Sequence, residues 1–259
     1  VALAATLIIA ACGSDDSESG AGTPTETIES ADTTVAETTP DTTTADTTPE
    51  TTAPEEAGQD VVADTAAAES ALLTVGDLPD GWTETPREEG ASELDARLAE
   101  CVGVDGDRIT AADATAQSAL FAAPDGALSL TQDIGVFATE RDARTVVAFT
   151  TEPSVPTCFA EAYTELAADV FAGTLAEGAE LGAPTATRLQ VGSAGDATQA
   201  VRVVVPVTGD PAVVAITVDH VVVRGGRALA GLTFENRAEA TPVETIDAVT
   251  AAVATRLGA

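Results

Sequence analysis

A single histidine restricts the acid–base chemistry that this chain could perform. His220 alternates with Ile216, Val218 and Val222 in a β-prone stretch, so the four side chains share one face of a predicted strand. A histidine on such an apolar face is usually a core residue with satisfied hydrogen bonds. A Ser-His-Asp triad would have to use His220, but Asp219 points to the opposite face and no serine is indicated beside it. The sequence also lacks the motifs G-x-S-x-G, H-E-x-x-H and G-x-G-x-x-G. No catalytic residues are therefore predicted, and the chain is not expected to be an enzyme.

Two arginines flank the strongest hairpin signal. Arg224 and Arg227 enclose Gly225-Gly226, a dipeptide that predicts a two-residue turn. In that hairpin the two guanidinium groups would face each other, and like charges directly opposite repel. Carboxylates of the chain or a bound anion must then neutralise them. Acids are plentiful in a chain with 43 acidic and 11 basic residues, and an anion-binding site at Arg224 and Arg227 is the alternative.

The composition excludes several classes of function. With a net charge of −32, the chain has few basic residues that could neutralise phosphate groups, so nucleic acid is not expected as a partner. All basic residues are arginines, which removes lysine Schiff-base chemistry and the P-loop. The single tryptophan, Trp82, follows the turn-forming Pro79-Asp80-Gly81. Trp82 is expected to pack onto the core, and a role as a ligand platform is the alternative.

The first cysteine follows a short apolar segment. Residues 1–11 read VALAATLIIAA, and Cys12 comes directly after them. This arrangement resembles the end of a bacterial lipoprotein signal peptide, with its hydrophobic region and lipobox; neither Met nor a basic region precedes it, so the signal peptide is expected to be incomplete here. The resemblance implies that the thiol of Cys12 receives diacylglycerol and that cleavage occurs just before it. The chain would then be held at the extracytoplasmic face of the cell membrane by lipid. A helix of this length rises only about 16 Å, against roughly 30 Å of hydrocarbon, so a membrane span is not expected.

The region from Cys12 to residue 70 is predicted to be a disordered linker. It is rich in threonine, proline and acidic residues, as in the run Thr47-Thr48-Pro49-Glu50-Thr51, and it contains no basic or aromatic residue. Such a segment buries too little apolar surface to offset the entropy of ordering. It is expected to hold the folded domain away from the membrane. The density of Thr and Pro is also typical of O-glycosylated stalks.

The other two cysteines are expected to form a disulfide. With Cys12 assigned to lipid, Cys101 and Cys158 remain, and outside the cytoplasm such a pair favours a disulfide. Metal ligation is the competing interpretation, but the chain has no C-x-x-C and a single histidine. No metal or other cofactor is predicted. Because Leu94, Leu98 and Cys101 fall on one apolar stripe of a helix, and Cys158 on that of another, the disulfide is expected to be buried between two helices.

Residues 71–259 are predicted to form one α+β domain. Hairpin and meander signals imply an antiparallel sheet, which helices would cover on one face. Thr241, Pro242 and Glu244 have the spacing of a capping box at the start of the last helix. The helices are expected to begin near Ser92 and to span residues 140–151, 154–173 and 242–257; the strands are expected at 114–122, 127–139, 185–191, 198–207, 213–224 and 227–235.

This layout resembles that of actinobacterial cell-envelope lipoproteins. It is similar to the extracellular sensor domains of mycobacterial Ser/Thr kinases and to lipoproteins of the Mog1/PsbP-like type. The matching features are a cysteine in each of two helices, a final helix, and two sequence stretches, Leu72-Leu73…Asp77-Leu78-Pro79…Gly81-Trp82 and Asp219-His220-Val221-Val222-Val223-Arg224-Gly225-Gly226-Arg227. The resemblance implies a non-catalytic domain that binds or senses a ligand. Kinase sensor domains have two disulfides, whereas this domain has cysteines for one.

We therefore expect a lipid-anchored, non-catalytic ligand-binding or sensor-like domain. Its partners would be the membrane, through the lipid on Cys12, and either a small ligand or an envelope protein. One alternative is a carrier of lipids or other apolar molecules, which would need an enclosed cavity lined by Val, Leu and Phe between sheet and helices. The other is a hydrolase with an unrecognised site, which would place His220 in a cleft beside a serine and a carboxylate.

Overall fold

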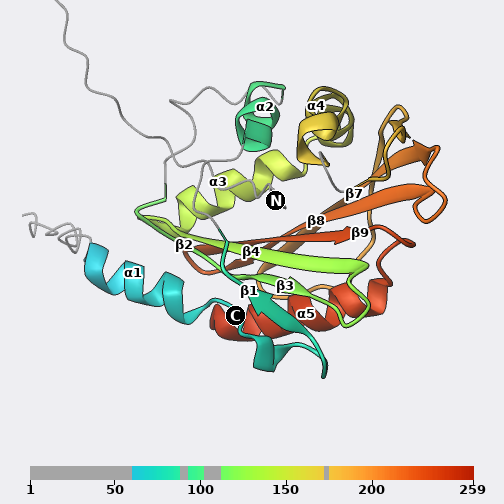
Figure 1. Cartoon of the computed structure of the whole chain (residues 1–259). Coiled ribbons are helices and arrows are strands. Elements are labelled where there is room, and N and C mark those ends of the chain that lie inside the picture. Colours follow the sequence, from blue (N-terminus) through green and yellow to red (C-terminus); the bar gives the residue numbers. More distant parts are fainter. Residues whose placement is uncertain (1–59, 88–92, 102–111, 172–174) are drawn as a thin grey trace, which may run out of the picture. The chain divides into compact units, whose positions relative to one another are not determined.

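The computed structural model describes residues 60–87, 93–101, 112–171 and 175–259. Within these ranges the chain forms an antiparallel sheet with helices packed on it, which confirms the α+β class (Figure 1). The helices are α1 (Val61–Ser70), α2 (Glu93–Cys101), α3 (Glu140–Thr150), α4 (Val155–Val170) and α5 (Val243–Arg256), with a 3-10 turn at Val75–Asp77. The strands are β1 (Thr83–Thr85), β2 (Ala114–Gln117), β3 (Leu120–Ala122), β4 (Leu128–Val136), β5 (Glu180–Leu181), β6 (Thr185–Arg188), β7 (Ala197–Thr208), β8 (Ala215–Gly225) and β9 (Ala228–Asn236).

The sheet is built around four long strands in the order β4-β9-β8-β7. The path continues to β3 and β1 beyond β4 and to β5 beyond β7, while β2 also pairs with β4 and β6 with β7. The meander from β6 to β9 is as predicted. The stretch at residues 114–122 is divided into β2 and β3, both paired with β4, because Ser118 interrupts it: its hydroxyl accepts from the backbone N–H of Gln132 at 2.9 Å.

Helices cover both faces of the sheet, and not the single face expected from the sequence. In Figure 1, α2, α3 and α4 lie on one side, and α1 and α5 on the other. The reason is that the central strands carry apolar residues at both parities. On β8, Ile216 and Val218 belong to the cluster under α4, whereas Val221 and Val223 belong to the cluster under α5. The sequence of a strand buried on both faces is a continuous apolar run, so it does not indicate which face the helices cover.

The folded region begins earlier than the predicted boundary at residue 71. Residues 61–70 form α1. Asp60 caps this helix, since its carboxylate accepts from the backbone N–H of Ala63 at 3.2 Å. Two side chains of α1 are buried, Ala68 and the charged Asp64, whose carboxylate pairs with Arg227 at 2.6 Å. So few buried residues leave no apolar periodicity to detect. The part of the linker before residue 60 lies outside the described residues.

A disulfide joins α2 to α4. It connects Cys101 and Cys158, the pair expected from the sequence, which are 57 residues apart. Cys158 is buried, with 1% of its surface exposed. Cys101 is exposed at the end of α2, so only one half of the bridge has the buried position that was expected. Leu98 and Leu94, about one and two turns earlier, bury the apolar side of α2 instead. Among the described residues, no helix has both the length and the apolar character of a membrane span.

Candidate functional site

A line of polar side chains crosses the central strands on the sheet face that α4 covers. His220 on β8 is paired with Thr233 on β9, and Thr233 is paired in turn with Thr131 on β4. Paired residues of adjacent strands point to the same face, so the three side chains are neighbours. Tyr163 of α4 contacts His220. We call Thr131, Thr233, His220 and Tyr163 the polar row.

The polar row is almost completely removed from solvent. The exposed fractions are 2% for Thr131, 6% for Thr233, 7% for His220 and 2% for Tyr163. Apolar clusters lie beside it on this face: the cluster under α4 includes Val203, Val205 and Ile216, and a separate cluster lies under α3. Polar groups at such a depth are costly unless they form hydrogen bonds.

His220 holds the row together by hydrogen bonds from both ring nitrogens. Its Nε2 lies 2.9 Å from the Tyr163 hydroxyl, and its Nδ1 lies 3.3 Å from Oγ1 of Thr233. In a neutral imidazole one nitrogen donates and the other accepts, and either hydroxyl can take the complementary role. The ring of Phe159 packs on the imidazole, with centroids 4.7 Å apart. The prediction of a histidine with satisfied hydrogen bonds is confirmed.

The hydroxyl of Thr131, in contrast to the ring nitrogens of His220, lacks a hydrogen bond among the described residues. Its Oγ1 is buried and has no hydrogen-bond partner among the described residues. A buried hydroxyl without a partner costs about 1–3 kcal/mol. Thr131 therefore keeps hydrogen-bonding capacity that the fold does not use, at a point directly beside Thr233.

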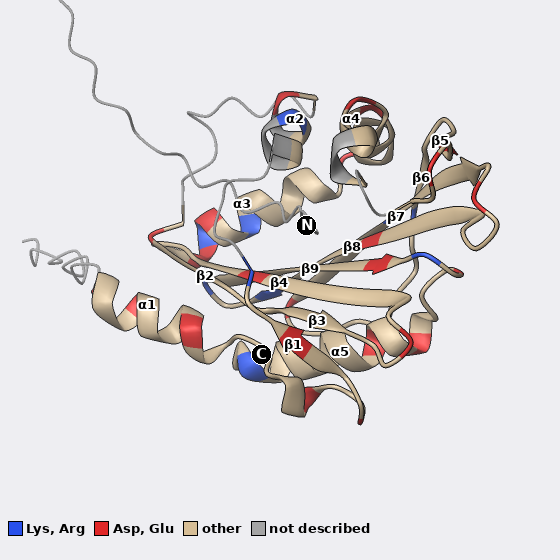
Figure 2. Ribbon diagram, viewed as in Figure 1, with Lys and Arg blue, Asp and Glu red and all other residues tan. Residues whose placement is uncertain are grey.

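An ion pair flanks the row on each side, along the strand direction. Asp133, two residues from Thr131, pairs with Arg87 at 3.0 and 3.1 Å. Glu235, two residues from Thr233, accepts from Arg237 at 2.7 and 2.8 Å. Figure 2 shows acidic positions within the central strands, where an apolar sheet would carry none. Asp133 and Glu235 thus each have an arginine of the chain beside them.

Asp219 belongs to the opposite face and is unable to orient His220. It is fully buried and forms a two-pronged pair with Arg202, at 2.6 and 2.9 Å. Burial raises the pKa of Asp219, although the hydrogen bonds from Arg202 act against this. Arg202 also donates to the carbonyl oxygen of Thr241 at 2.7 Å. The pair therefore fastens the start of α5 to the sheet.

The predicted capping box of α5 is wrong in detail. The helix begins at Val243 with Pro242 in the cap position and no side-chain capping bond. The reason is that Thr241 is turned inward: 1% of it is exposed, and its carbonyl accepts from Arg202.

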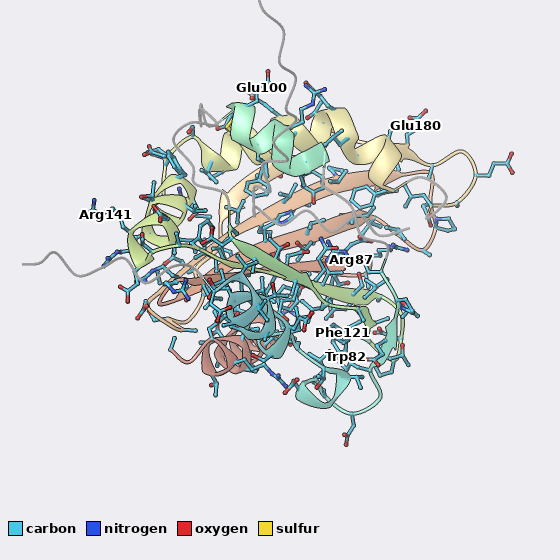
Figure 3. All side chains as sticks on the ribbon, turned by 90° about the vertical axis from the view of Figure 1, so that its left-hand side faces the viewer. Trp82, Arg87, Glu100, Phe121, Arg141 and Glu180 are labelled. Atoms are coloured by element: carbon cyan, nitrogen blue, oxygen red, sulfur yellow. A yellow bond between two sulfur atoms is a disulfide. The ribbon has the colours of Figure 1, made fainter. Side chains whose placement is uncertain are left out.

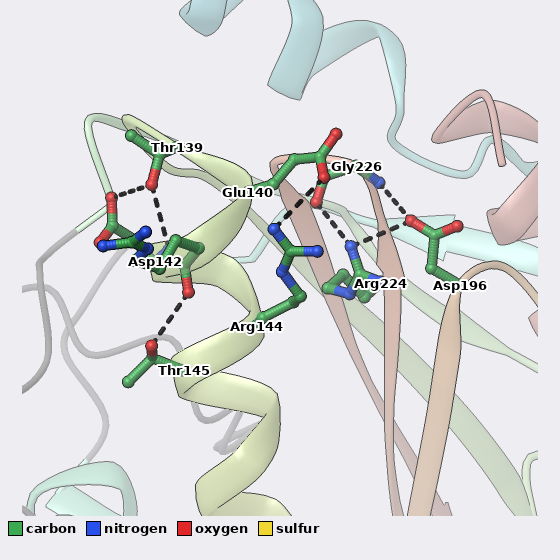
Figure 4. A network of polar contacts seen from close by, with 9 residues as sticks. Thr139, Glu140, Asp142, Arg144, Thr145, Asp196, Arg224 and Gly226 are labelled. Atoms are coloured by element: carbon green, nitrogen blue, oxygen red, sulfur yellow. Dashed lines mark hydrogen bonds and ion pairs between the residues drawn. The ribbon is translucent and has the colours of Figure 1, made fainter.

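Acids of the chain neutralise the arginine pair of the hairpin. Arg224 pairs with Asp196 at 3.0 Å and also donates to the carbonyl of Gly226 (Figure 4). Arg227 pairs with Asp64 at 2.6 Å, which holds the pKa of that carboxyl below its usual value. These contacts supply the neutralisation that the sequence left open, and they give the anion-binding alternative no support.

The hairpin is also shifted by one residue from the predicted turn. The register pairs Gly225 with Ala228 and Arg224 with Leu229, so the turn is formed by Gly226 and Arg227. Gly226 has a φ of +57°, which suits glycine. Arg227 therefore does not face Arg224 but leaves the sheet and reaches Asp64 on α1.

The remaining predicted site residues are not part of the row. Trp82 is half-buried against the cluster on the α5 side, near Phe121 (Figure 3). This is the packing position expected from the sequence. Cys12 and the predicted signal peptide lie outside the described residues. Among the described residues, no group of three or more His, Cys, Asp or Glu is placed to hold a metal ion.

Sequence reasoning singled out His220 but missed its neighbours in the row. The sequence did contain a signal. Two predicted strands, otherwise apolar, each carry a pair of polar residues two positions apart: Thr131 and Asp133 on one, and Thr233 and Glu235 on the other. Such a spacing places polar groups on one face of a strand.

Comparison with known proteins gives distant structural likeness alone. No protein-family model and no curated protein matches the chain. Among solved structures, it is similar to the extracellular domain of PknH from Mycobacterium tuberculosis, with 11% sequence identity and a TM-score of 0.41, over 75% of this chain and 96% of that one. A likeness of this degree carries no argument about function, which has to come from the chain's own residues.

Proposed function

We propose that this chain is a lipid-anchored, extracytoplasmic domain that binds a ligand at the polar row without transforming it. The observation that carries the proposal is the Thr131 hydroxyl, buried in the row without a partner among the described residues. Valine has nearly the same shape and would avoid the cost of this hydroxyl. Proteins tend to keep such locally unfavourable groups where function needs them.

The described contacts of His220 do not form the set of groups that hydrolysis needs. Its described hydrogen bonds are made to a phenol and to a threonine hydroxyl. A serine hydrolase would instead need a serine on one nitrogen and a carboxylate on the other. The neighbouring Asp219 is bound to Arg202 on the opposite face. The carrier alternative is less well supported, because Val203, Val205 and Ile216 under α4 are fully buried in a packed cluster.

The location outside the membrane rests on two features of the sequence and one of the structure. Cys12 directly follows an apolar segment of the lipobox type, and the acidic composition gives no electrostatic attraction to anionic lipid. The Cys101–Cys158 disulfide fits an oxidising compartment. Lipid on Cys12 would then be the anchor, and the threonine-rich linker the spacer.

Native mass spectrometry of the full-length chain purified from its own host tests ligand binding. We expect a small molecule to accompany the wild-type protein. It should be lost from Thr131→Val, which lacks the hydroxyl, and retained by Thr131→Ser, the matched control that keeps it. A wild-type protein that carries no molecule, or a molecule that Thr131→Val retains in full, would contradict the proposal.

Membrane fractionation tests the anchor. Cys12→Ser should move the protein from the membrane fraction to the soluble extracytoplasmic fraction, because no acyl chain can be attached. Ser14→Ala, two residues away, is the control and should stay with the membrane. If the Cys12→Ser protein stays there as well, lipid on Cys12 is not what anchors the chain.

A further inference from the structure

We infer that the Cys101–Cys158 disulfide is a thiol-exchange site that opens at Cys101 and selects against thiols that carry a negative charge of their own. Its opening frees α2 from α4. Three observations carry this assignment: the unequal exposure of the two cysteines, the carboxylate beside Cys101, and the narrow attachment of α2.

The two halves of the bridge differ in their access to solvent. Cys101 is exposed at the end of α2, whereas Cys158 is 1% exposed and belongs to the apolar cluster under α4. A thiolate has to reach the sulfur that it attacks. Exchange is therefore confined to Cys101, and the sulfur of Cys158 is the leaving group.

The exchange takes place in two steps. The thiolate of an external thiol bonds to Sγ of Cys101, and the bond to Cys158 breaks, so that Cys158 leaves with the electron pair and takes a proton from water. A second molecule of the thiol then attacks the external sulfur of this adduct and frees the Cys101 thiol. The protein disulfide is reduced by two electrons, and two thiols are oxidised to one small disulfide.

A carboxylate stands beside the sulfur that is attacked. Oε2 of Glu161 lies 3.5 Å from Sγ of Cys101. Among the described residues Glu161 forms no ion pair, because the nearby Arg97 is engaged by Glu165 at 3.5 Å and by Glu100 at 3.8 Å. The negative charge of Glu161 is thus left to act on the incoming group.

This charge repels every thiolate, but to different degrees. Two like charges about 4 Å apart in water slow an approach about fivefold. A thiol with its own carboxylate brings a second negative charge and is slowed further, whereas an ammonium group on the thiol cancels the charge of its thiolate. The site therefore favours uncharged and cationic thiols.

Helix α2 depends on the bridge for its position. Its other described attachments are Leu94 and Leu98, which pack in the cluster under α4, and the pair of Arg97 with Glu165. That pair is 46% and 59% exposed, so it contributes little. Once the disulfide is open, two leucines and one exposed ion pair are what hold α2 on α4.

A matched series of thiols tests the selection. Cysteamine, 2-mercaptoethanol and 3-mercaptopropionate share one two-carbon frame and carry a positive, no and a negative charge beside the thiol. Each reacts at pH 8 and low salt with the full-length Cys12→Ser protein, in which Cys101 and Cys158 are the only cysteines. Mass spectrometry after an acid quench gives the rate of opening. The same rates are measured with Glu161→Gln and with Glu180→Gln, an exposed acid on β5, as the control.

The ratio of variant to parent rates removes the intrinsic reactivity of each thiol. We expect Glu161→Gln to raise the rate about fivefold for 2-mercaptoethanol, by more for 3-mercaptopropionate, and little for cysteamine. Glu180→Gln should change none of the three rates. An equal ratio for all three thiols with Glu161→Gln, or no increase for any, overturns the selection.

The point of attack and the release of α2 are measured on the same samples. When the quenched protein is unfolded, alkylated and digested, the thiol adduct should be on Cys101 and the alkyl group on Cys158. Hydrogen exchange of the opened protein should rise across residues 93–101 and stay unchanged in β8 and β9. An adduct on Cys158, an unchanged α2, or a loss of protection that extends to β8 and β9 overturns the inference. None of these results depends on whether the polar row holds a ligand.

Discussion

Thr131 is the residue at which stability and function are expected to conflict. Its hydroxyl is buried without a partner among the described residues, next to Thr233. Thr131→Val keeps the volume of the side chain and removes the unsatisfied group, so it should raise the free energy of unfolding by about 1 kcal/mol. Urea denaturation measures this. A loss of stability of similar size would mean that the hydroxyl has a partner in the folded protein.

Asp77 makes the fold sensitive to acid. Arg256 donates to its carboxylate at 2.6 Å, and this bond, with weaker ones from Thr74, lowers the pKa of Asp77 from 3.8 to about 2. A carboxylate with a lowered pKa stabilises the fold above its unfolded pKa. That contribution should disappear as the pH falls from about 4 to about 2.

The variant Asp77→Asn isolates this contribution. It should be less stable than the wild type at pH 6 and should show a smaller loss of stability between pH 4 and pH 2, as followed by thermal unfolding. Asp80→Asn, an exposed acid in the same loop, serves as the control. Equal pH dependence of the Asp77→Asn and wild-type proteins would show that the bond to Arg256 does not form.

At the level of elements, α1 depends on a polar contact. Asp64 reaches Arg227 at 2.6 and 3.2 Å, and Arg227 also donates to the carbonyl oxygen of Phe137 at 2.8 Å. Asp64→Asn weakens the pair, and since 41% of the Arg227 side chain is exposed the cost should be about 1 kcal/mol. Hydrogen exchange should rise across residues 61–70 and stay unchanged in β8 and β9. Glu69→Gln, on the exposed side of the helix, is the control, and unchanged protection of α1 in Asp64→Asn would contradict this role.

The disulfide should stabilise the position of α2 on α4. It closes a loop between residues 57 apart, which corresponds to about 4 kcal/mol in the chain-entropy model. Reduction should lower the free energy of unfolding by about this amount and increase hydrogen exchange in α2. Alkylation of the folded, unreduced protein should leave both cysteines unmodified. Two modified thiols would show that the bridge is not formed.

Local sequence signals identified most of these elements, but not their long-range contacts. The antiparallel meander and the spans of α3 and α4 followed from alternation, turns and helix stops. The proximity of Thr131 to Thr233 could not be predicted in this way. It depends on the pairing of β4 with β9, which are about a hundred residues apart in the sequence. Helix α1 was not predicted because a buried charged residue, Asp64, attaches it to the sheet, and a search for hydrophobic periodicity does not detect charged residues.

For the whole molecule, the two faces of the sheet have different roles. The face under α1 and α5 is closed by one large apolar cluster, which includes Leu130, Ile134 and Phe234 at 0% exposure. The face under α2, α3 and α4 has two smaller clusters, and the polar row lies on the same face. Under the proposed function, one face supplies stability while the other provides the polar groups that would contact a ligand.

The central claim is that the polar row holds a ligand, and the resonances of His220 test it most directly. The full-length protein is isolated from its host and measured before and after it is unfolded, washed free of small molecules and refolded. The account predicts that the imidazole signals of His220 differ between the two samples while those of Trp82 coincide. Identical His220 signals in both samples would contradict it.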